Sequence, residues 1–411
     1  MTGEKLQLKN KKLPKGWRKV KLGEIVNVSG GGTPSTSNPK YWGGNIAWLT
    51  PAEVVALNGN RFIDKTERYI TEEGLKNSSA KVMPANSLLL TSRATIGEVV
   101  INKIPMATNQ GFINIEPKEV DLMFLFYWLK NNRKFLNQMA IGSTFNELSK
   151  SVFKKIDILL PEDINEQKRI AEILSAFDDK IELNNKIIKT LEEMAQEIFK
   201  EWFNENSKFK IQKSKLKKWD AGYLGDGIYS EIIKPKVKKF EGEKIYLATA
   251  DVEKNEIINE KTKISYDNRP IRANMEPVLN SIWFAKMINT YKVLFFFEGN
   301  KENIEKYILS TGFMGIKALK NMQYYLYLFI NSKKFHQIKD TLVQGAVQEA
   351  ITNTNVKQIK FLVPPADLIN KFNEKVEPLL IKAYKLKKEN QILAALRDLL
   401  LPKLMSGETR V

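Results

Sequence analysis

Two stretches of the chain carry apolar side chains at alternating spacings of four and three residues. This 3.5-residue period predicts two long helices that pair as a coiled coil, because it keeps one apolar stripe facing a partner helix. The alternative is that each helix packs its stripe against its own globular domain. The stripe positions are Ile170, Leu174, Phe177, Ile181, Asn184, Ile188, Leu191, Ala195, Ile198 and Trp202 in the first helix and Phe372, Val376, Leu379, Ala383, Leu386, Asn390, Leu393, Arg397, Leu400 and Leu404 in the second.

One asparagine interrupts each stripe. Asn184 is the fifth position of the first stripe, and Asn390 is the sixth position of the second. In an antiparallel pair with matched ends these two positions face each other, so we expect the asparagines to meet. Such a buried pair costs stability but fixes the register of the helices. Pro378 lies inside the second expected helix, and because proline kinks a helix we expect good pairing only from Leu379 onward.

The segments that precede the two helices resemble each other. Four pairs of matching stretches occur in the same order, separated by 194 to 203 positions. Four matches in one order indicate duplication of a globular unit rather than chance. The matching stretches are Trp48–Val54 with Tyr246–Val252, Asn86–Leu90 with Asn280–Phe284, Gly111–Phe112 with Gly312–Phe313, and Phe153–Pro161 with Val356–Pro364.

Outside the two stripes, short apolar runs alternate with turn residues, a pattern typical of strands and short helices. The expected fold class is α/β (α+β), with two similar globular domains, each followed by a long helix, and the helices paired antiparallel with pseudo-two-fold symmetry. Further helices are expected at 122–138 and, in the repeat, at 323–340. The expected boundaries are 1–161 for the first globular domain, 162–204 for a central spacer helix, 205–220 for a basic linker, 221–365 for the second globular domain and 366–411 for a C-terminal spacer helix.

The net charge of +18 at pH 7, with a sequence pI near 9.5, favours a polyanionic partner. Each lysine or arginine set against a phosphate releases a condensed counterion. A general lysine enrichment in an AT-rich bacterial proteome is the alternative. Residues 163–203 hold ten acidic and six basic side chains, whereas residues 208–218 hold six lysines and no acid. This segregation predicts basic surfaces for nucleic acid and an acidic helix for protein partners.

Few side chains suited to catalysis are available. The sequence has no cysteine, and its one histidine, His336, lies on a lysine-flanked amphipathic segment, so thiolate chemistry and cysteine-ligated zinc are excluded. Residues 38–41 (Asn-Pro-Lys-Tyr) are close to the Asn-Pro-Pro-Tyr of adenine methyltransferases, but lysine replaces the second proline and no cofactor loop precedes it. Glycines 30–32 lack the Gly-Lys-Ser/Thr that completes a phosphate-binding loop. We therefore predict a protein that is not an enzyme and that has no catalytic, metal-binding or cofactor-binding residues.

Polar side chains gather in several glycine-containing turns, where they suit contacts to DNA. Hydroxyl, amide and lysine groups hydrogen-bond phosphates and base edges, and arginine can bind guanine through two hydrogen bonds. Ordinary surface loops are the alternative, and Arg93 could equally form an ion pair inside its domain. The candidate DNA-binding residues are Thr33, Ser35, Thr36, Asn38, Lys40, Trp42, Arg93, Asn109, Gln110, Ser143 and Thr144 in the first domain and Lys286, Asn289, Gln344 and Gln348 in the second.

The chain carries no sequence signal for a membrane. No apolar run approaches the roughly 18 residues that a span needs, and the densest stretch, 322–330, contains a glutamine and three tyrosines. Residues 1–12 lack the apolar core of a signal peptide. We expect a cytoplasmic protein without a membrane partner.

The amino-acid sequences of several stretches, and their order along the chain, resemble those of the specificity (S) subunit of type I restriction–modification systems. The resemblance covers essentially the whole chain. The chain departs from the family pattern in one respect, because the second domain lacks the Gly-Gly-Thr-Pro loop of the first. The DNA-reading residues of the second domain therefore cannot be inferred from those of the first. The stretches that carry the resemblance are Leu13–Glu24, Ser29–Ser35, Trp42–Thr50, Leu88–Gly97, Ile158–Pro161, Glu166–Asp178 and Leu396–Gly407.

The resemblance implies a subunit that reads a bipartite double-stranded DNA target with two target-recognition domains and performs no chemistry itself. It further implies docking of two methyltransferase (M) subunits and, in the full complex, two restriction (R) motor-nuclease subunits. No cofactor is expected on this chain, because S-adenosylmethionine, ATP and Mg²⁺ would bind the partner subunits. A structural or RNA-binding adaptor and a degenerate DNA methyltransferase fusion are the remaining alternatives.

Overall fold

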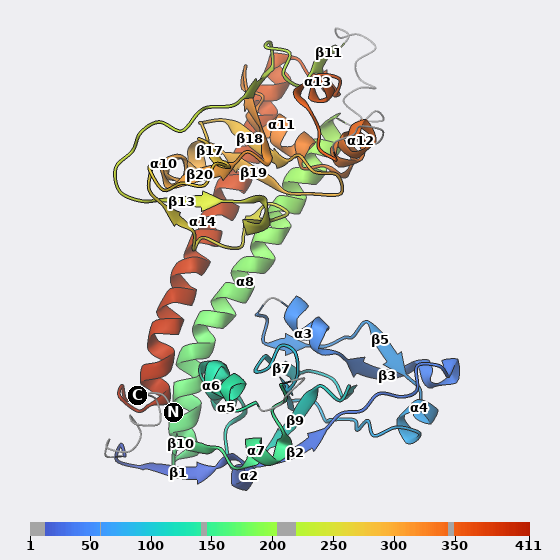
Figure 1. Ribbon diagram of the computed structural model, residues 1–411, viewed down its shortest axis with the longest axis vertical. Coiled ribbons are helices and arrows are strands. Elements are labelled where there is room, and N and C mark those ends of the chain that lie inside the picture. The colour runs from blue at the N-terminus through green and yellow to red at the C-terminus, as the bar shows by residue number, and fades with distance from the viewer. Residues whose placement is uncertain (1–12, 58, 141–145, 204–218, 344–348) are drawn as a thin grey trace. The chain divides into compact units, whose positions relative to one another are not determined.

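The computed structural model describes residues 13–57, 59–140, 146–203, 219–343 and 349–411. The chain forms two compact units, residues 1–183 with 390–411 (the first unit) and residues 184–389 (the second unit). Two long helices, α8 (Ile164–Phe203) and α14 (Ala366–Met405), each contribute one part to each unit (Figure 1). The domain boundaries expected from the sequence stay predictions.

In its described residues, the first unit contains two sheets and a separate strand pair. The larger sheet has the strand order β2-β9-β6-β7-β4, the smaller has the order β5-β3-β8, and β1 pairs with β10. Neighbouring strands are antiparallel, except that β4 with β7 and β3 with β8 are parallel. The strands are β1 (Trp17–Lys21), β2 (Val26–Gly30), β3 (Trp42–Leu49), β4 (Phe62–Ile63), β5 (Arg68–Ile70), β6 (Leu88–Thr91), β7 (Val99–Asn102), β8 (Met106–Thr108), β9 (Phe112–Pro117) and β10 (Asp157–Pro161); the shorter helices are α2 (Leu22–Ile25), η1 (Pro39–Tyr41), α3 (Pro51–Ala56), α4 (Glu72–Lys76), α5 (Leu122–Asn131), α6 (Arg133–Gln138) and α7 (Lys150–Lys154).

The described part of the second unit is built in the same way. One sheet has the strand order β12-β21-β18-β19, another has the order β16-β13-β20-β17, β11 pairs with β22, and β14 and β15 form a short hairpin. Only β13 with β20 is parallel among these pairs. The strands are β11 (Asp220–Tyr223), β12 (Ser230–Ile233), β13 (Lys244–Leu247), β14 (Val252–Glu253), β15 (Glu256–Ile257), β16 (Lys263–Ile264), β17 (Ala273–Met275), β18 (Ser281–Ala285), β19 (Val293–Phe296), β20 (Tyr307–Ser310), β21 (Phe313–Ala318) and β22 (Lys360–Val363); the shorter helices are η3 (Thr249–Asp251), η4 (Glu298–Asn300), α10 (Glu302–Lys306), α11 (Gln323–Ile330), α12 (Lys333–Val343) and α13 (Asn353–Val356).

The two units repeat one topology, which confirms the predicted duplication. The antiparallel run β2-β9-β6-β7 corresponds to β12-β21-β18-β19, and the parallel pair β3 and β8 corresponds to β13 and β20. The correspondence extends to a single backbone angle. Asn86 and Asn280, which belong to one of the matched stretches, precede β6 and β18 with φ values of +65° and +58°. Asparagine tolerates this left-handed conformation better than most residues.

The two shorter helices expected from the sequence each prove to be a pair. Residues 122–138 form α5 and α6, and residues 323–340 lie in α11 and α12. The break in the first unit falls at Asn132, whose φ of −98° and ψ of 13° leave the helical region. Its side chain donates to the carbonyl of Trp128 at 2.8 Å. An asparagine that bonds its own backbone in this way competes with helix continuation, a local effect that the apolar pattern does not reveal.

One apolar cluster of the first unit joins its larger sheet, α5 and the two long helices. Phe124 and Leu129 of α5 are completely buried and share one apolar cluster with Leu174 of α8 and with Leu401 and Leu404 of α14. Arg61, only 2% exposed, ties the sheet to α8 through its bonds to Asp179 at 2.5 Å and Glu182 at 2.8 Å. Both apolar packing and a charged contact therefore attach the helices to this unit.

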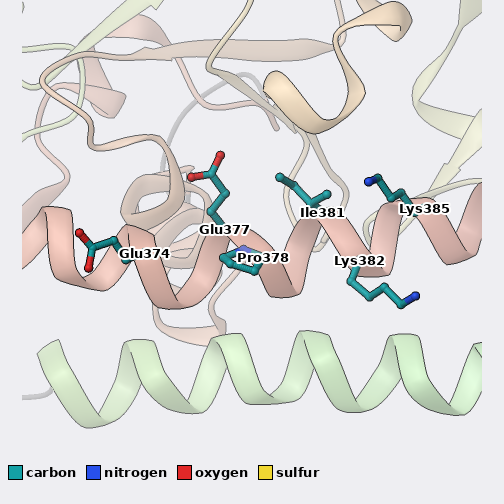
Figure 2. A pocket seen from close by; sticks show the side chains of 6 residues that line it. All are labelled: Glu374, Glu377, Pro378, Ile381, Lys382 and Lys385. Carbon is teal, nitrogen blue, oxygen red and sulfur yellow. The ribbon is translucent and has the colours of Figure 1, made fainter.

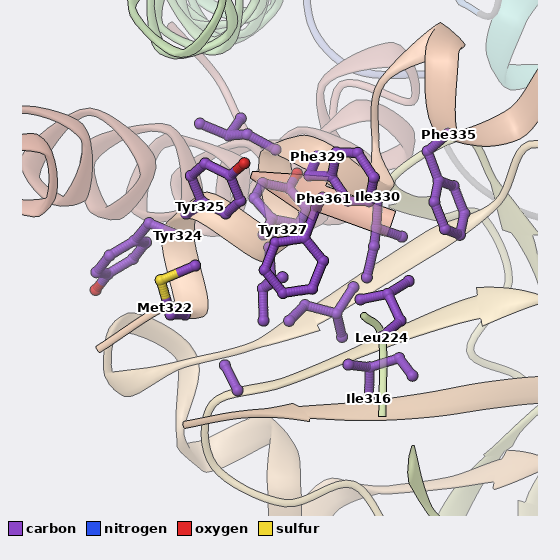
Figure 3. Packing of buried hydrophobic residues seen from close by; sticks show 14 of the residues in the cluster. Leu224, Ile316, Met322, Tyr324, Tyr325, Tyr327, Phe329, Ile330, Phe335 and Phe361 are labelled. Atoms are coloured by element: carbon purple, nitrogen blue, oxygen red, sulfur yellow. The ribbon is translucent and has the colours of Figure 1, made fainter. Parts of the chain in front are cut away.

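Aromatic rings dominate the core of the second unit. Most residues of α11 are buried, and Figure 3 shows Tyr324, Tyr325, Tyr327 and Phe329 of this helix crowded above the sheet. The Phe203 ring, near the end of α8, lies 4.8 Å from that of Tyr325. Edge-to-face ring pairs add about 0.5–1.5 kcal/mol each beyond the area they bury. The same cluster therefore joins α11 to the end of α8.

Parts of α8 and α14 lie side by side in each unit (Figure 1). In the first unit the beginning of α8 packs with the end of α14, and in the second unit the end of α8 packs with the beginning of α14. The helices therefore run antiparallel, which confirms the expected pairing. Asn184 is fully buried and Asn390 half-buried, but their meeting stays a prediction.

Pro378 does not disturb the pairing as expected, and this prediction was wrong. α14 continues without a break from Ala366 to Met405, and Phe372, six residues before the proline, packs against Phe203 with ring centroids 4.8 Å apart. Pro378 is exposed, and Figure 2 shows it on the side of α14 that lines a shallow hollow with Glu374 and Glu377. A proline on the water-facing side leaves a carbonyl that water can satisfy.

Candidate DNA interface

The polar turns of the first unit meet at one edge of its larger sheet. Because neighbouring strands are antiparallel, β2 and β6 end where β7 and β9 begin. The turns that follow or precede these strand ends are the segments 30–38, 92–98 and 109–111. These three segments are called the first sheet edge. The order of strands in the sheet thus brings together turns that are distant in the sequence.

The glycine-rich loop of the first sheet edge is fixed by close backbone approach. Gly32 donates its N–H to the carbonyl of Thr108 at 2.9 Å, and the indole of Trp48 donates to the carbonyl of Gly32 at 2.9 Å. A Cβ on Gly31 would collide with the backbone of Thr108 and Asn109. These glycines therefore permit tight packing of the loop.

The hydroxyl-rich part of this loop is exposed. Thr33 donates a hydrogen bond to the side-chain oxygen of Gln110, which joins the loop to the 109–111 turn. The hydroxyls of Ser35 and Ser37 lie 2.8 Å apart, and the Asn38 side chain accepts from the N–H of Lys40 at 3.1 Å. The predicted contacts Thr33, Ser35, Thr36, Asn38, Lys40 and Gln110 thus lie within two adjoining turns, and of these Asn38 alone is half-buried.

Trp42 supports the loop. Its indole N–H donates to the carbonyl of Ser35 at 3.1 Å, and its ring meets that of Trp48 edge-on, with centroids 5.0 Å apart. The guanidinium of Arg68 lies 3.6 Å from the centroid of the Trp42 ring, a cation–π contact. Sequence reasoning missed Arg68, because only the pairing of β3 with β5 places it over Trp42.

Arg93 lies on the neighbouring turn of the same edge. Its guanidinium is 2.9 Å from the carboxylate of Glu147, and the Arg93 side chain is still 47% exposed. Asn109 is half-buried, and its side chain accepts from the N–H of Gly111 at 2.8 Å, so this group stabilises the turn. Ser143 and Thr144 lie outside the described residues. The DNA-binding roles of all these side chains stay predictions.

The equivalent edge of the second unit carries different side chains. Lys286 follows β18, and the exposed Asn289 adopts a left-handed φ of +55° in the turn before β19. The N–H of Asn289 donates to Asp340 of α12 at 3.1 Å, and the buried Lys339 donates to the carbonyl of Met287 at 2.7 Å. Gln344 and Gln348 lie outside the described residues. Residues 234–235, 286–292 and 311–312 are called the second sheet edge.

Lys286 is a half-buried cation. Burial, and in addition the charge of Lys234, lower the pKa of its ammonium. Lys234 directly follows β12 and was not among the residues expected from the sequence. The sequence pattern of a single turn could not predict that Lys234 lies near Lys286, because the two lysines follow strands that are separated by β21 in the sheet.

His336 packs beneath the second sheet edge. Its side chain is 5% exposed, and its ring centroid lies 4.8 Å from that of Tyr291 and 5.4 Å from that of Phe335. Burial, with a further contribution from Lys339, lowers the pKa of His336 to about 4, while Asp340 acts in the opposite direction. The imidazole is therefore neutral at pH 7.

This burial predicts a pH-dependent stability. The unfolded chain binds a proton at His336 near pH 6.5, whereas the folded chain does so only near pH 4. The neutral, buried His336 therefore makes its full contribution to the free energy of unfolding above pH 6.5. This contribution is lost as the pH falls, and at pH 4 the free energy of unfolding is lower by about 3 kcal/mol. As this is the sole histidine, its NMR titration is unambiguous. His336→Phe should remove this part of the acid sensitivity, and an imidazole that titrates near 6.5 would contradict the assignment.

Two structural findings limit the chemistry of the described residues. No group of three or more histidine, aspartate or glutamate side chains among them is arranged to hold a metal ion. None of the helices formed by these residues is both long enough and apolar enough to cross a membrane.

The duplicated unit and the paired helices define a class of protein with two similar globular domains on antiparallel helices, and comparison with known proteins shows its family. Residues 14–193 match the type I restriction modification DNA specificity domain. The chain is 32% identical to the MjaIX specificity subunit of Methanocaldococcus jannaschii over 427 residues, which covers 97% of this chain and 95% of the relative. It is 36% identical to the EcoR124I/EcoR124II specificity subunit of Escherichia coli over 165 residues, 38% of this chain and 40% of that protein.

A solved structure agrees at the level of the fold. The S subunit of a type I restriction–modification system from M. genitalium aligns with a TM-score of 0.60 and 18% identity, covering 96% of this chain and 97% of that one. The chain belongs to the family of type I restriction–modification specificity subunits.

Proposed function

We propose that this chain reads a bipartite double-stranded DNA sequence, with one half recognised by each sheet edge. The main support for this proposal is that the two units have equivalent sheet edges whose polar side chains differ. The first edge presents Thr33, Gln110 and Arg93, and the second presents the exposed Asn289. A duplicated scaffold with divergent polar turns suits a target whose two halves differ. Base-edge contacts specify sequence, whereas phosphate contacts position the protein.

The long helices are the proposed docking surface for partner subunits. Residues 163–203 carry a net charge of −4 in a chain whose overall charge is +18. A negatively charged helix such as α8 does not favour DNA, but it suits a protein partner of opposite charge. We propose that two methyltransferase subunits dock there and that two restriction motor-nuclease subunits join the full complex in the cytoplasm.

The chain itself is proposed to be non-catalytic. S-adenosylmethionine, ATP and Mg²⁺ are assigned to the partner subunits. Residues 38–41, which resemble an adenine methyltransferase motif, support this view, because the Asn38 side chain accepts a hydrogen bond from the Lys40 N–H and caps η1. An asparagine used as a cap has an ordinary local role.

Mapping of methylated bases tests the proposal. The chain is expressed with its cognate methyltransferase subunit in cells that lack other methylation, and modified positions are read by sequencing. The expected result is adenine methylation in one sequence split by a fixed spacer. An active partner that methylates no split sequence would overturn the proposal, and association with RNA instead would favour an adaptor. The control is the methyltransferase subunit expressed alone.

A further inference from the structure

The two units can be compared position by position at their sheet edges. Ser92 donates its N–H to Gly111 at 2.7 Å and accepts from Leu148 at 3.0 Å. In the second unit Lys286 donates to Gly312 at 3.0 Å and accepts from Ile351 at 3.0 Å. Identical backbone bonding makes Lys286 the counterpart of Ser92.

A second equivalence follows from strand register. Gly30 pairs with Ile113 in the first unit, and Ile233 pairs with Gly315 in the second. As Gly111 corresponds to Gly312, Ile113 corresponds to Met314, and the position opposite Met314 is Lys234. The second unit therefore has a lysine where the first has a glycine.

A lysine from another element occupies this place in the first unit. A Cβ added to Gly30 would lie 2.9 Å from Nζ of Lys150, the first residue of α7. The residue at the same helix position in the second unit is Asn353, the first residue of α13. Each unit therefore has a lysine at the end of the equivalent strand. In the first unit Lys150 of α7 lies beside the end of β2, and in the second unit Lys234 itself follows β12.

These lysines have no acidic partner among the described residues. None of Lys150, Lys234 and Lys286 forms an ion pair within the part of the chain that the structure describes. Burial of Lys286, and in addition repulsion from the charge of Lys234, lower the pKa of its ammonium. A bound anion would relieve this repulsion, because an opposite charge within a few ångströms favours the charged ammonium.

We propose that Lys150 in the first unit, and Lys234 with Lys286 in the second, each hold one DNA backbone phosphate at equivalent places beside the sheet edge. This inference rests on the proposed DNA-reading function and assigns these residues to positioning, separate from base reading. Phosphate is the anion that fits, because it recurs along DNA whatever the sequence. An equivalent anchor can therefore serve two units whose base-reading side chains differ.

Salt-dependent DNA binding tests the assignment on the full chain assembled with its methyltransferase partner. Loss of one phosphate contact should reduce the slope of log K against log salt by about 0.9 and weaken binding about fivefold at 0.15 M salt. Lys150→Gln should produce this change, the double variant Lys234→Gln with Lys286→Gln should produce it again, and all three together should double it. Target and unrelated DNA should be affected equally, with the methylated sequence unchanged.

Two controls separate the outcomes. Lys301→Gln removes an exposed lysine of the second unit that already pairs with Glu298 at 2.6 Å, and it should leave the slope unchanged. Lys286→Arg keeps the charge and should retain the slope. Normal wild-type binding with an unchanged slope in the variants, or an altered methylated sequence, would overturn the phosphate assignment. Absence of DNA binding by the wild-type complex would overturn the proposed function itself.

Discussion

Replacing Phe372 with alanine should lower the free energy of unfolding of the second unit by about 3–5 kcal/mol, the cost of deleting a large buried ring. The Phe372 side chain is 0% exposed, and its ring lies 4.8 Å from that of Phe203 and 5.9 Å from that of Trp202. The substitution would remove the ring through which the start of α14 packs against the end of α8.

Hydrogen exchange followed peptide by peptide would measure this effect. Amides of α11 that exchange only through unfolding of the second unit should exchange more than about a hundredfold faster, since each 1.4 kcal/mol is a factor of ten. Lys371→Ala, at the exposed neighbouring position, is the matched control and should change stability by less than about 0.5 kcal/mol. Equal effects of the two substitutions would contradict the packing described for α14.

Asp178→Ala should destabilise the first unit by about 3 kcal/mol, in the range found when one partner of a buried ion pair is removed. Asp178 is 5% exposed, accepts a hydrogen bond from the Tyr127 hydroxyl at 2.7 Å and pairs with Arg397 of α14. Lys130, whose pKa burial lowers, lies 3.9 Å from the same carboxylate. Without Asp178, these mostly buried cations would lose an anion that joins both long helices to α5.

The neighbouring aspartate supplies the control for this substitution. Asp179 also bonds a buried cation, Arg61, but its side chain is 66% exposed and Arg61 keeps its bond to Glu182. Asp179→Ala should therefore cost only about 1 kcal/mol. Urea unfolding of both variants would measure the difference, and a loss for Asp178→Ala no greater than that for Asp179→Ala would contradict the network.

Both long helices could be predicted from the sequence because their pattern is local. A 3.5-residue period repeated over ten positions specifies a seam without knowledge of the partner. The effect of Pro378 was misjudged, because this residue lies between the stripe positions Val376 and Leu379 and is exposed, so the hydrogen bond that it cannot form falls outside the seam. The break at Asn132 depends on a side chain that bonds its own backbone, and this competes with helix formation over a single turn.

The sheet edges were only partly predictable. The sequence predicts Thr33 and Gln110 separately, each as a polar residue of its own turn. It does not predict the hydrogen bond between them, because that bond depends on the order of strands in the sheet. Arg68 over Trp42, and Lys150 beside Gly30, were missed for the same reason. Each contact joins residues that are distant in sequence, so it exists only after the strands have paired.

Domain exchange tests the proposal that each unit reads one half of a split target. Residues 1–161 would be replaced by the corresponding residues of another specificity subunit, and the methylated sequence would be mapped with the cognate methyltransferase present. One half of the target should change while the other half is retained. A target that changes in both halves, or in neither, would contradict the assignment of one half-site to each unit.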